Sequence, residues 1–476
     1  MVYSKFMPSR RSFLLGMGAS GLLGAFPIRS GRADSTGVIT LSAKPGKFDI
    51  MADAGPITDV WAYNGRVPGP ELRVRQGERL QVRFENAIPQ DSTIHWHGMR
   101  IPNAMDGVPV LTQPPVPSGG TFDYDFTPPD AGTYWYHPHV KSSEQLGRGL
   151  YGPLIVEEAE PPKVDREVTW VIDDWRINQN GEIDDSFHNM RDMSHGGRLG
   201  NVAALNGVSS DTFSVRAGER IRLRLINVAN ARVFALNFAD HEPVVIALDG
   251  HPVDPFTPEN GRVVLASGQR ADLVIDMPGK PGQVTPVMDD YFSRGIYKFL
   301  DLVYDNKPPL RDNPLDAPVR LSSNPLPEPA QADAKVMEVL IGGGAMGKMR
   351  EARFKGQTLG IRELVGVGKV WAINGEVFDP ANMAPMFTVA KGSTQRLLIS
   401  NETSWPHPMH LHGHALKTIA RNGRKVEREF WTDTVFLDPD EQVEALFVAD
   451  NPGDWLFHCH VLEHHEAGMA TVIRVA

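Results

Sequence analysis

Eight histidines of this 476-residue chain stand in four pairs of the form His-x-His. The pairs are His95 and His97, His137 and His139, His410 and His412, and His458 and His460. Because alternate side chains of a β-strand project from the same face, both imidazoles of a pair point the same way. Eight imidazoles are too many for one metal ion and suit three ions with two or three ligands each, and imidazole is a good copper ligand. The pattern therefore predicts a cluster of metal ions.

A second site is predicted around Cys459, the single cysteine of the chain. It lies between His458 and His460, so its side chain faces the opposite side of the same strand. Three further candidate ligands are His464 and Met469, which follow Cys459 by five and ten residues, and His407, which precedes the pair at His410 by three. Two histidines, a thiolate and a weak thioether form the ligand set of a blue-copper electron-transfer site. The alternative, a buried inert thiol, leaves the position of Cys459 between two ligand histidines unexplained.

An internal repeat must position these residues. Segments 74–86, 215–227 and 389–401 each begin with Val, carry Gly three residues later and end on Asn nine residues after that. In the first and third copies an H-x-H pair begins nine residues after the Asn, whereas the second copy has Leu236-Asn237-Phe238 there. A lone pair would more often be ordinary core or surface histidines, but four pairs in register with a repeat predict a shared site between the first and third copies.

The repeat also predicts the fold class. Polar and apolar residues alternate after the Gly in the first two copies, which is typical of half-buried strands. The chain has 45 Gly and 38 Pro and almost no amphipathic helical pattern. We predict an all-β protein of three Greek-key β-sandwich domains, residues 34–158, 159–306 and 335–476, with a Pro-rich linker over 307–334.

The first 33 residues resemble an export signal. Arg10 and Arg11 precede an apolar, glycine-broken stretch, and the segment ends in small residues at Ala33. This is typical of a bacterial twin-arginine signal peptide, which predicts recognition by the twin-arginine export machinery and a periplasmic location. The alternative is an uncleaved membrane anchor, but we expect no stable membrane insertion of the mature chain. The formal net charge of −10 argues against a general nucleic-acid binder.

The four histidine motifs together resemble the copper signatures of the multicopper oxidases. The motifs are His95-Trp96-His97-Gly98, His137-Pro138-His139, the run from His407 to Gly413 and the run from His458 to Met469. The resemblance spans about residues 37–476 and implies three cupredoxin-like domains in a laccase-like arrangement with four copper ions. It implies a type 1 copper on His407, Cys459, His464 and Met469, a type 2 copper on His95 and His410, and two type 3 coppers on His97, His137 and His460 and on His139, His412 and His458.

The same resemblance implies an oxidase that uses dioxygen. A reducing substrate would give up electrons one at a time at an exposed edge of His464 or His407, and the electrons would pass through Cys459 to reduce dioxygen to two waters. Asp106 matches the family's acid near the type 2 copper, and Glu466 is a second candidate proton donor. Phenols or aromatic amines are the expected substrates, because Trp405 offers an aromatic ring near His407.

Two other functions stay open on the sequence. One is a metal-ion oxidase acting on Cu(I) or Mn(II), for which Met346 and Met349 are the best soft ligands, with Met383 and Met386 as possible additions. The other is a non-enzymatic copper-holding or structural protein, which the complete ligand set disfavours.

The remaining histidines are expected to be structural or exposed. Four lie in the predicted second domain, outside any ligand pattern: His188, His195, His241 and His251. On strand geometry, His414 and His465 should face away from their ligand neighbours. His465 stands where relatives of the family carry an acid, which leaves the route of protons open.

Overall fold

The structure of the chain is a computed structural model, and it describes residues 31–32, 37–52, 55–316 and 319–476. The predicted leader, residues 1–33, lies outside the described residues apart from Gly31 and Arg32. These two form strand β1 (Gly31–Arg32), which pairs in parallel with β4 (Leu72–Arg75). No helix in the described ranges is long and apolar enough to cross a membrane.

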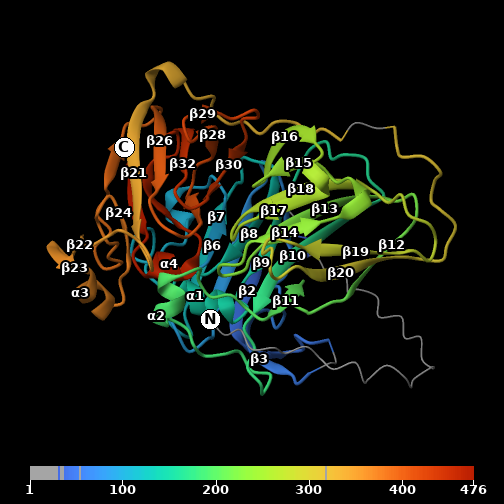
Figure 1. The fold of residues 1–476 in the computed structure, drawn as a ribbon, viewed down its shortest axis with the longest axis horizontal. Coiled ribbons are helices and arrows are strands. Elements are labelled where there is room, and N and C mark those ends of the chain that lie inside the picture. The colour runs from blue at the N-terminus through green and yellow to red at the C-terminus, as the bar shows by residue number, and fades with distance from the viewer. Residues whose placement is uncertain (1–30, 33–36, 53–54, 317–318) are drawn as a thin grey trace.

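The fold is all-β, as predicted, and the described residues build three β-sandwiches of two sheets each (Figure 1). The first sandwich joins one sheet of β1, β4, β9 (Gly152–Glu157), β8 (Gly132–His137) and β6 (His95–His97) to another of β3 (Thr58–Tyr63), β2 (Ile39–Phe48), β5 (Leu80–Asn86) and β7 (Thr121–Phe126).

The second sandwich lies between residues 166 and 304. One of its sheets contains β11 (Val202–Leu205), β10 (Arg166–Trp175), β13 (Arg220–Asn227), β18 (Arg270–Asp276), β15 (Val244–Leu248) and β16 (His251–Phe256). The other contains β12 (Thr212–Val215), β20 (Tyr297–Tyr304), β19 (Val284–Asp289), β14 (Phe234–Asn237) and β17 (Arg262–Leu265).

The third sandwich lies between residues 335 and 475. Its first sheet contains β24 (Trp371–Ile373), β21 (Lys335–Gly343), β26 (Thr394–Asn401), β32 (Gln442–Val448), β28 (Leu416–Arg421), β29 (Arg424–Lys425) and β30 (Trp431–Thr432). Its second sheet contains β25 (Phe387–Val389), β34 (Ala470–Val475), β33 (Gly453–Cys459), β27 (His407–Leu411) and β31 (Thr434–Leu437). A separate hairpin pairs β22 (Glu351–Phe354) with β23 (Gln357–Gly360).

Helices in the described ranges are short and connect strands. They are α1 (Ser142–Gly147), α2 (Met190–Ser194), α3 (Ile361–Gly366) and α4 (Leu462–Glu466), with 3-10 turns η1 (Asn103–Met105), η2 (Ala239–His241), η3 (Glu259–Gly261) and η4 (Gln331–Asp333). The domain boundaries at 158/159, 306/307 and 334/335 remain predictions.

The sequence repeat corresponds to a repeated strand arrangement. The strand that carries each copy pairs in parallel with the first long strand of its sandwich: β5 with β2, β13 with β10 and β26 with β21. Each of these strands ends on a buried asparagine, Asn86, Asn227 or Asn401. Each Oδ1 accepts the backbone N–H two residues further on, and each Nδ2 donates to two backbone carbonyls. The asparagine thus fixes the turn that leads toward the ligand position.

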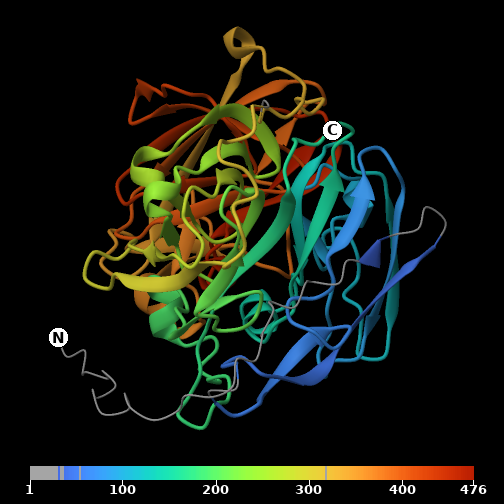
Figure 2. The same ribbon diagram turned by 90° about the vertical axis from the view of Figure 1, so that its right-hand side faces the viewer.

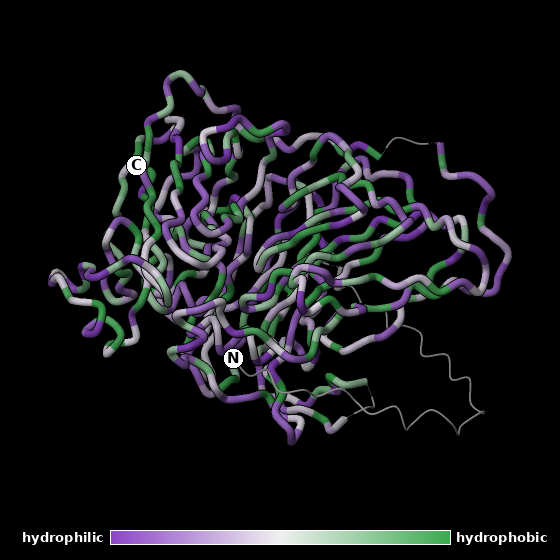
Figure 3. Tube along the Cα trace, in the orientation of Figure 1, coloured by the Kyte–Doolittle hydropathy of each residue, from purple (hydrophilic) through white to green (hydrophobic). Residues whose placement is uncertain are grey.

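Hydrophobic residues fill each sandwich. Each sandwich has its own cluster of buried apolar side chains. The clusters include Leu41 and Phe84 in the first sandwich, Leu223 and Phe234 in the second, and Trp371 in the third. Apolar and polar residues alternate along many strands in Figure 3, as half-buried strands require. The first sandwich contacts both others, through β8 with β13 and β18 and through α1 with α4 (Figures 1 and 2).

Candidate metal centre

The four H-x-H pairs converge between the first and third sandwiches. In the first, β6 carries His95 and His97 and pairs with β8, which ends at His137. In the third, β27 pairs with β33, so that His410 lies opposite His458. The eight imidazoles are buried, none of them more than 6% exposed.

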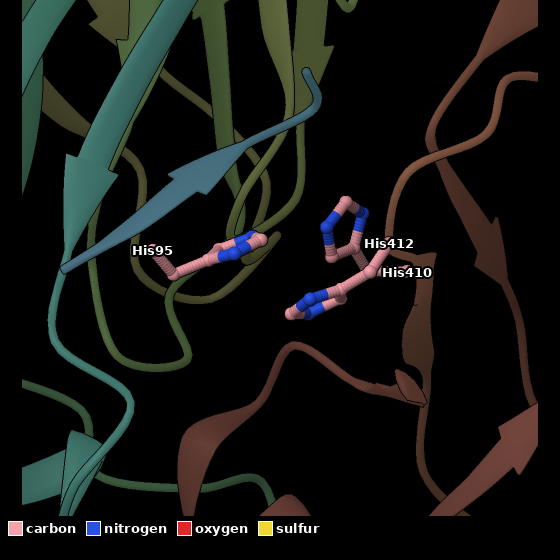
Figure 4. A group of neighbouring side chains, drawn as sticks. All are labelled: His95, His410 and His412. Atoms are coloured by element: carbon pink, nitrogen blue, oxygen red, sulfur yellow. The ribbon is translucent and has the colours of Figure 1, made fainter. Parts of the chain in front are cut away.

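Rings from the two sandwiches stack on each other across the interface. The centroids of His95 and His412 are 3.9 Å apart, and those of His97 and His410 are 3.8 Å apart. Figure 4 shows His95 reaching from its strand toward His410 and His412 on the opposite segment. The structure therefore brings together the residues that the sequence placed in one cluster.

The ring nitrogens are arranged as ligands require. Among the described residues, six of these imidazoles have one buried nitrogen with no hydrogen-bond partner: His95 Nε2, His97 Nδ1, His137 Nε2, His139 Nε2, His410 Nε2 and His460 Nε2. The Nε2 atoms of the other two, His412 and His458, face each other at 3.0 Å. In seven of the eight rings the opposite nitrogen is held by a protein group. A second nitrogen fixed in this way is the usual environment of a metal-binding histidine.

Burial also favours the neutral form of seven cluster imidazoles. Desolvation lowers the pKa of each of them: His97, His137, His139, His410, His412, His458 and His460. A neutral imidazole has the free lone pair that a metal ion needs.

Donor atoms from different pairs lie close enough to share ions. Three sets of donor atoms each lie within 4.8 Å of one another: those of His139, His412 and His458, of His95, His410 and His412, and of His95, His97 and His137. The rings of His97, His137 and His460 have centroids 4.8–5.8 Å apart. The eight donors can therefore surround several ions in one cavity.

Asp106 links the two halves of the cluster. Its side chain is 1% exposed, and its Oδ2 accepts the Nδ1–H of His412 at 2.9 Å. Its backbone carbonyl accepts the Nδ1–H of His95 at 2.8 Å. The acid that the sequence singled out thus holds one imidazole from each sandwich.

A second carboxylate, Asp433, holds the other stacked pair and was not predicted from the sequence. Its Oδ1 lies 3.2 Å from His97 Nε2 and 3.2 Å from His410 Nδ1. The pseudo-symmetry of the repeat suggests a counterpart of Asp106. The spacing hides it, because Asp106 follows His95 by 11 residues whereas Asp433 follows His410 by 23.

Cys459 lies in a second cluster of donor atoms. Its Sγ is 3.6 Å from His407 Nδ1 and 3.7 Å from His464 Nδ1, and the two nitrogens are 3.1 Å apart. Burial raises the pKa of the Cys459 thiol and lowers the pKa of His464 to about 3. Met469 is fully buried in the same hydrophobic cluster, and its carbonyl accepts the N–H of Cys459. Two imidazole nitrogens and a thiol sulfur can therefore take one ion between them.

The expected exposed ligand edge near Cys459 is wrong, because both histidines are fully buried. His407 Nε2 contacts Thr403 Oγ at 2.8 Å, and His464 Nε2–H donates to the backbone carbonyl of His195 at 2.6 Å. The ring of His195 is half-buried and lies 5.3 Å from the half-buried ring of Trp405. No sequence pattern identified His195, because it comes from the second sandwich, which carries no ligand motif.

Glu466 lies beside the cluster rather than in it. Its carboxylate accepts the backbone N–H and hydroxyl of Ser143, and it lies 2.9 Å from His188 Nδ1. These contacts with Glu144 and Glu466 raise the pKa of His188 to about 10. His139, His188, His465 and Glu466 line a cleft of about 270 Å³. The cleft therefore brings Glu466 and a cluster imidazole, His139, to a common wall that also includes apolar side chains such as Phe378 and Leu456.

His465 does not point away from the ligands, so that expectation is wrong. Its ring centroid is 4.6 Å from that of His458. Strand geometry does not apply here, because residues 462–466 form helix α4. His414 does face the core, where its ring packs against Trp455.

Comparison with known proteins agrees with the family resemblance of the sequence motifs and extends over nearly the whole chain. Residues 47–161, 166–292 and 355–476 each match a protein family described as multicopper oxidase. Multicopper oxidase MmcO of Mycobacterium tuberculosis is 31% identical, with 97% of this chain and 96% of that protein covered.

Solved structures agree with this assignment. That of a multi-copper oxidase from Pseudomonas parafulva is 36% identical with a TM-score of 0.77, and that of one from Pseudomonas thermotolerans is 33% identical with a TM-score of 0.78. In both cases 92% of this chain and 100% of the other chain are covered.

Proposed function

We propose a role for each site residue on the premise that this chain belongs to the multicopper oxidase family. It is therefore a copper-dependent oxidase that passes electrons from a reducing substrate to dioxygen. Four copper ions are held by the twelve predicted ligands. The type 1 ion takes His407, Cys459, His464 and Met469; the type 2 ion takes His95 and His410; and the type 3 ions take His97, His137 and His460, and His139, His412 and His458.

The single observation that carries this proposal is the orientation of the ring nitrogens. Six buried imidazole nitrogens have no partner among the described residues, and the other nitrogen of nearly every ring is held. Leaving so many buried polar atoms unsatisfied would cost about 1–3 kcal/mol each. Metal ions as partners of those nitrogens remove that cost, and copper suits imidazole and thiolate ligands.

Bound copper supplies one-electron redox chemistry, and together the four ions store the four electrons that reduce dioxygen to two waters. The residues do the rest. Cys459 joins the type 1 site to His458 and His460 through a few covalent bonds, which gives electrons a short path. Asp106, in contact with His412, and Glu466, at the cleft beside His139, place carboxylates near the cluster that can relay protons to it.

For the substrate, we propose an electron-rich organic ring, a phenol or aromatic amine, as in laccases. Trp405 is half-buried, its ring lies 5.3 Å from that of His195, and its Nε1–H donates to the carbonyl of Ala345, which fixes the orientation of the ring. Two of the four candidate soft ligands lie elsewhere: Met349 packs beside Ala352, and Met383 lies beside Val108 in another cluster. Met386 packs against the cluster that contains Cys459, and Met346, next to Ala345, is exposed to solvent. A fixed aromatic surface favours stacking over metal coordination.

For the location, we propose twin-arginine export to the periplasm, with cleavage near Ala33. The support is the Arg10-Arg11 motif, which lies outside the described residues. Replacing both arginines by lysine should leave the protein in the cytoplasm, and unchanged export would contradict this part of the proposal.

The reaction is tested by oxygen uptake with a phenol and with Cu(I) as alternative donors. We expect four electrons consumed per dioxygen without hydrogen peroxide, and a higher kcat/KM for the phenol. Trp405→Ala should raise KM for the phenol, whereas Trp405→Phe, which keeps an aromatic ring, should largely restore it. A tenfold preference for Cu(I), lost in the Met346→Ala/Met349→Ala variant, would show instead that the protein is a metal-ion oxidase.

A further inference from the structure

The second sandwich carries none of the predicted ligands, yet one of its side chains reaches the copper cluster. Arg270, the first residue of β18, is fully buried. Its Nη1 donates to Asp433 Oδ1 at 2.9 Å, and its Nη2 lies 2.7 Å from Asp433 Oδ2. The guanidinium thus contacts both carboxylate oxygens, one through a hydrogen bond and the other as a close ion pair without hydrogen-bond geometry.

The carboxylate in turn contacts two cluster imidazoles from different sandwiches. Asp433 Oδ1 lies 3.2 Å from His97 Nε2 and 3.2 Å from His410 Nδ1, and the backbone carbonyl of Asp433 also accepts the Nδ1–H of His410 at 3.0 Å. The nitrogens left toward the cavity are therefore His97 Nδ1 and His410 Nε2.

His97 differs from the other cluster histidines in the ring nitrogen that it leaves without a hydrogen-bond partner. It presents Nδ1, whereas the five other cluster rings with an unpartnered nitrogen, those of His95, His137, His139, His410 and His460, present Nε2. An imidazole that donates from Nε2 keeps its lone pair on Nδ1, so the acceptor beside Nε2 determines which atom can bind a metal ion. For His97 the carboxylate acceptor is Asp433, and the group that holds Asp433 is Arg270.

The backbone at Gly98 leaves room for the Arg270–Asp433 ion pair. Gly98, which ends the first H-x-H motif, has a φ of 84°. A Cβ atom at this position would lie 2.3 Å from Arg270 Nη2 and 2.3 Å from Asp433 Oδ2. The glycine after His97 thus allows the ion pair to lie directly against the ligand strand.

We propose that Arg270 is a positioning residue for the copper cluster: through the Asp433 carboxylate it determines which ring nitrogen His97 presents to the metal. This inference rests on the ligand set proposed above. It gives the ligand-free second sandwich a part in copper binding that extends beyond packing.

The test measures copper binding rather than turnover. Holoprotein of the Arg270→Met variant is depleted and refilled with copper, and the ions are counted while the type 1 absorption and the type 2 electron paramagnetic resonance signal are recorded. We expect the affinity of the cluster for copper to fall about 10- to 100-fold, the usual effect of losing a group that orients a metal ligand. The type 1 absorption per chain should stay unchanged.

Arg222→Met is the matched control. Arg222 is also fully buried in the second sandwich, where it pairs with Asp272 and Glu158, and no contact with a cluster imidazole is recorded for it. The Arg222→Met substitution therefore removes a buried cation comparable with that of Arg270. Cluster copper that falls alike in both variants, or in neither, would overturn the proposal.

Arg270→Lys covers the case in which Arg270→Met does not fold. Lysine keeps the positive charge but not the two-pronged geometry. We expect a folded chain with weakened cluster copper, and wild-type copper affinity would overturn the inference. A wild-type protein that binds copper only at the type 1 site would instead refute the proposed ligand set.

Discussion

Acid should destabilise the copper-free chain steeply below about pH 6.5. Burial lowers the pKa of seven cluster imidazoles in the folded protein. In the unfolded chain these histidines titrate near a pKa of about 6.5. Below that pH the unfolded state binds more protons, so stability falls as pH decreases; above it both states are neutral and the imidazoles contribute no pH dependence.

The magnitude follows from the number of imidazoles. At pH 5.5 each unfolded histidine is about 90% protonated, and keeping its folded counterpart neutral costs about 1.4 kcal/mol. Seven of them cost up to about 10 kcal/mol, which is comparable with the total stability of about 5–15 kcal/mol typical of proteins. Bound copper occupies the same nitrogens and excludes the protons, so it should remove most of this loss.

Urea unfolding of copper-free and copper-loaded protein at pH 7.5, 6.5 and 5.5 measures the effect. The His137→Gln/His139→Gln variant is the control, because it removes two of the seven imidazoles and should recover about 3 kcal/mol of the loss at pH 5.5. A copper-free chain equally stable at pH 7.5 and 5.5 would refute the reasoning.

Three further predictions concern single side chains. Asp106→Asn should slow dioxygen reduction and leave reduction of the type 1 copper by substrate nearly unchanged in stopped-flow measurements; equal slowing of both would count against its role with protons. His188→Gln should lower the melting temperature below pH 6.5, with the difference from wild type vanishing as pH rises through about 10, because the raised pKa of His188 makes its contacts with Glu144 and Glu466 stabilising only while it is protonated; a difference independent of pH would refute this. Asn227→Ala should destabilise the chain by about 2–3 kcal/mol, since it leaves buried backbone groups unpaired, with no change in copper content; a fall in copper content would contradict its purely structural role.

The sequence predicted those parts of the molecule that follow from strand periodicity. The all-β class is confirmed, and the H-x-H pairs meet because each lies on or just beyond a strand with period two. The repeat located those strands, because the asparagine that ends each copy fixes the turn that follows it. Cys459 could be singled out because it lies within one of these motifs, and Asp106 because it matches the acid near the type 2 copper in the multicopper oxidase family.

Residues that act across the interfaces could not be predicted in this way. His195, Ser267 and Arg270 come from the second sandwich, and only the packing of the three sandwiches brings them to His464, His460 and Asp433. The strand rule was wrong for His465 because a helix begins after the last ligand pair. The edge of His464 that was predicted to be exposed is covered by His195. Because His195 comes from the second sandwich, the sequence motifs could not predict this contact.

The central claim, that Cys459 and the eight converging imidazoles form two distinct copper sites, is tested most directly by counting copper in wild type and Cys459→Ser. We expect four ions and an intense blue colour in the wild type. The variant should fold, keep three ions and lose the blue colour, because a serine hydroxyl cannot replace the thiolate–copper bond. A variant that keeps the blue absorption at full intensity, or a folded variant that loses all four ions, would contradict this account.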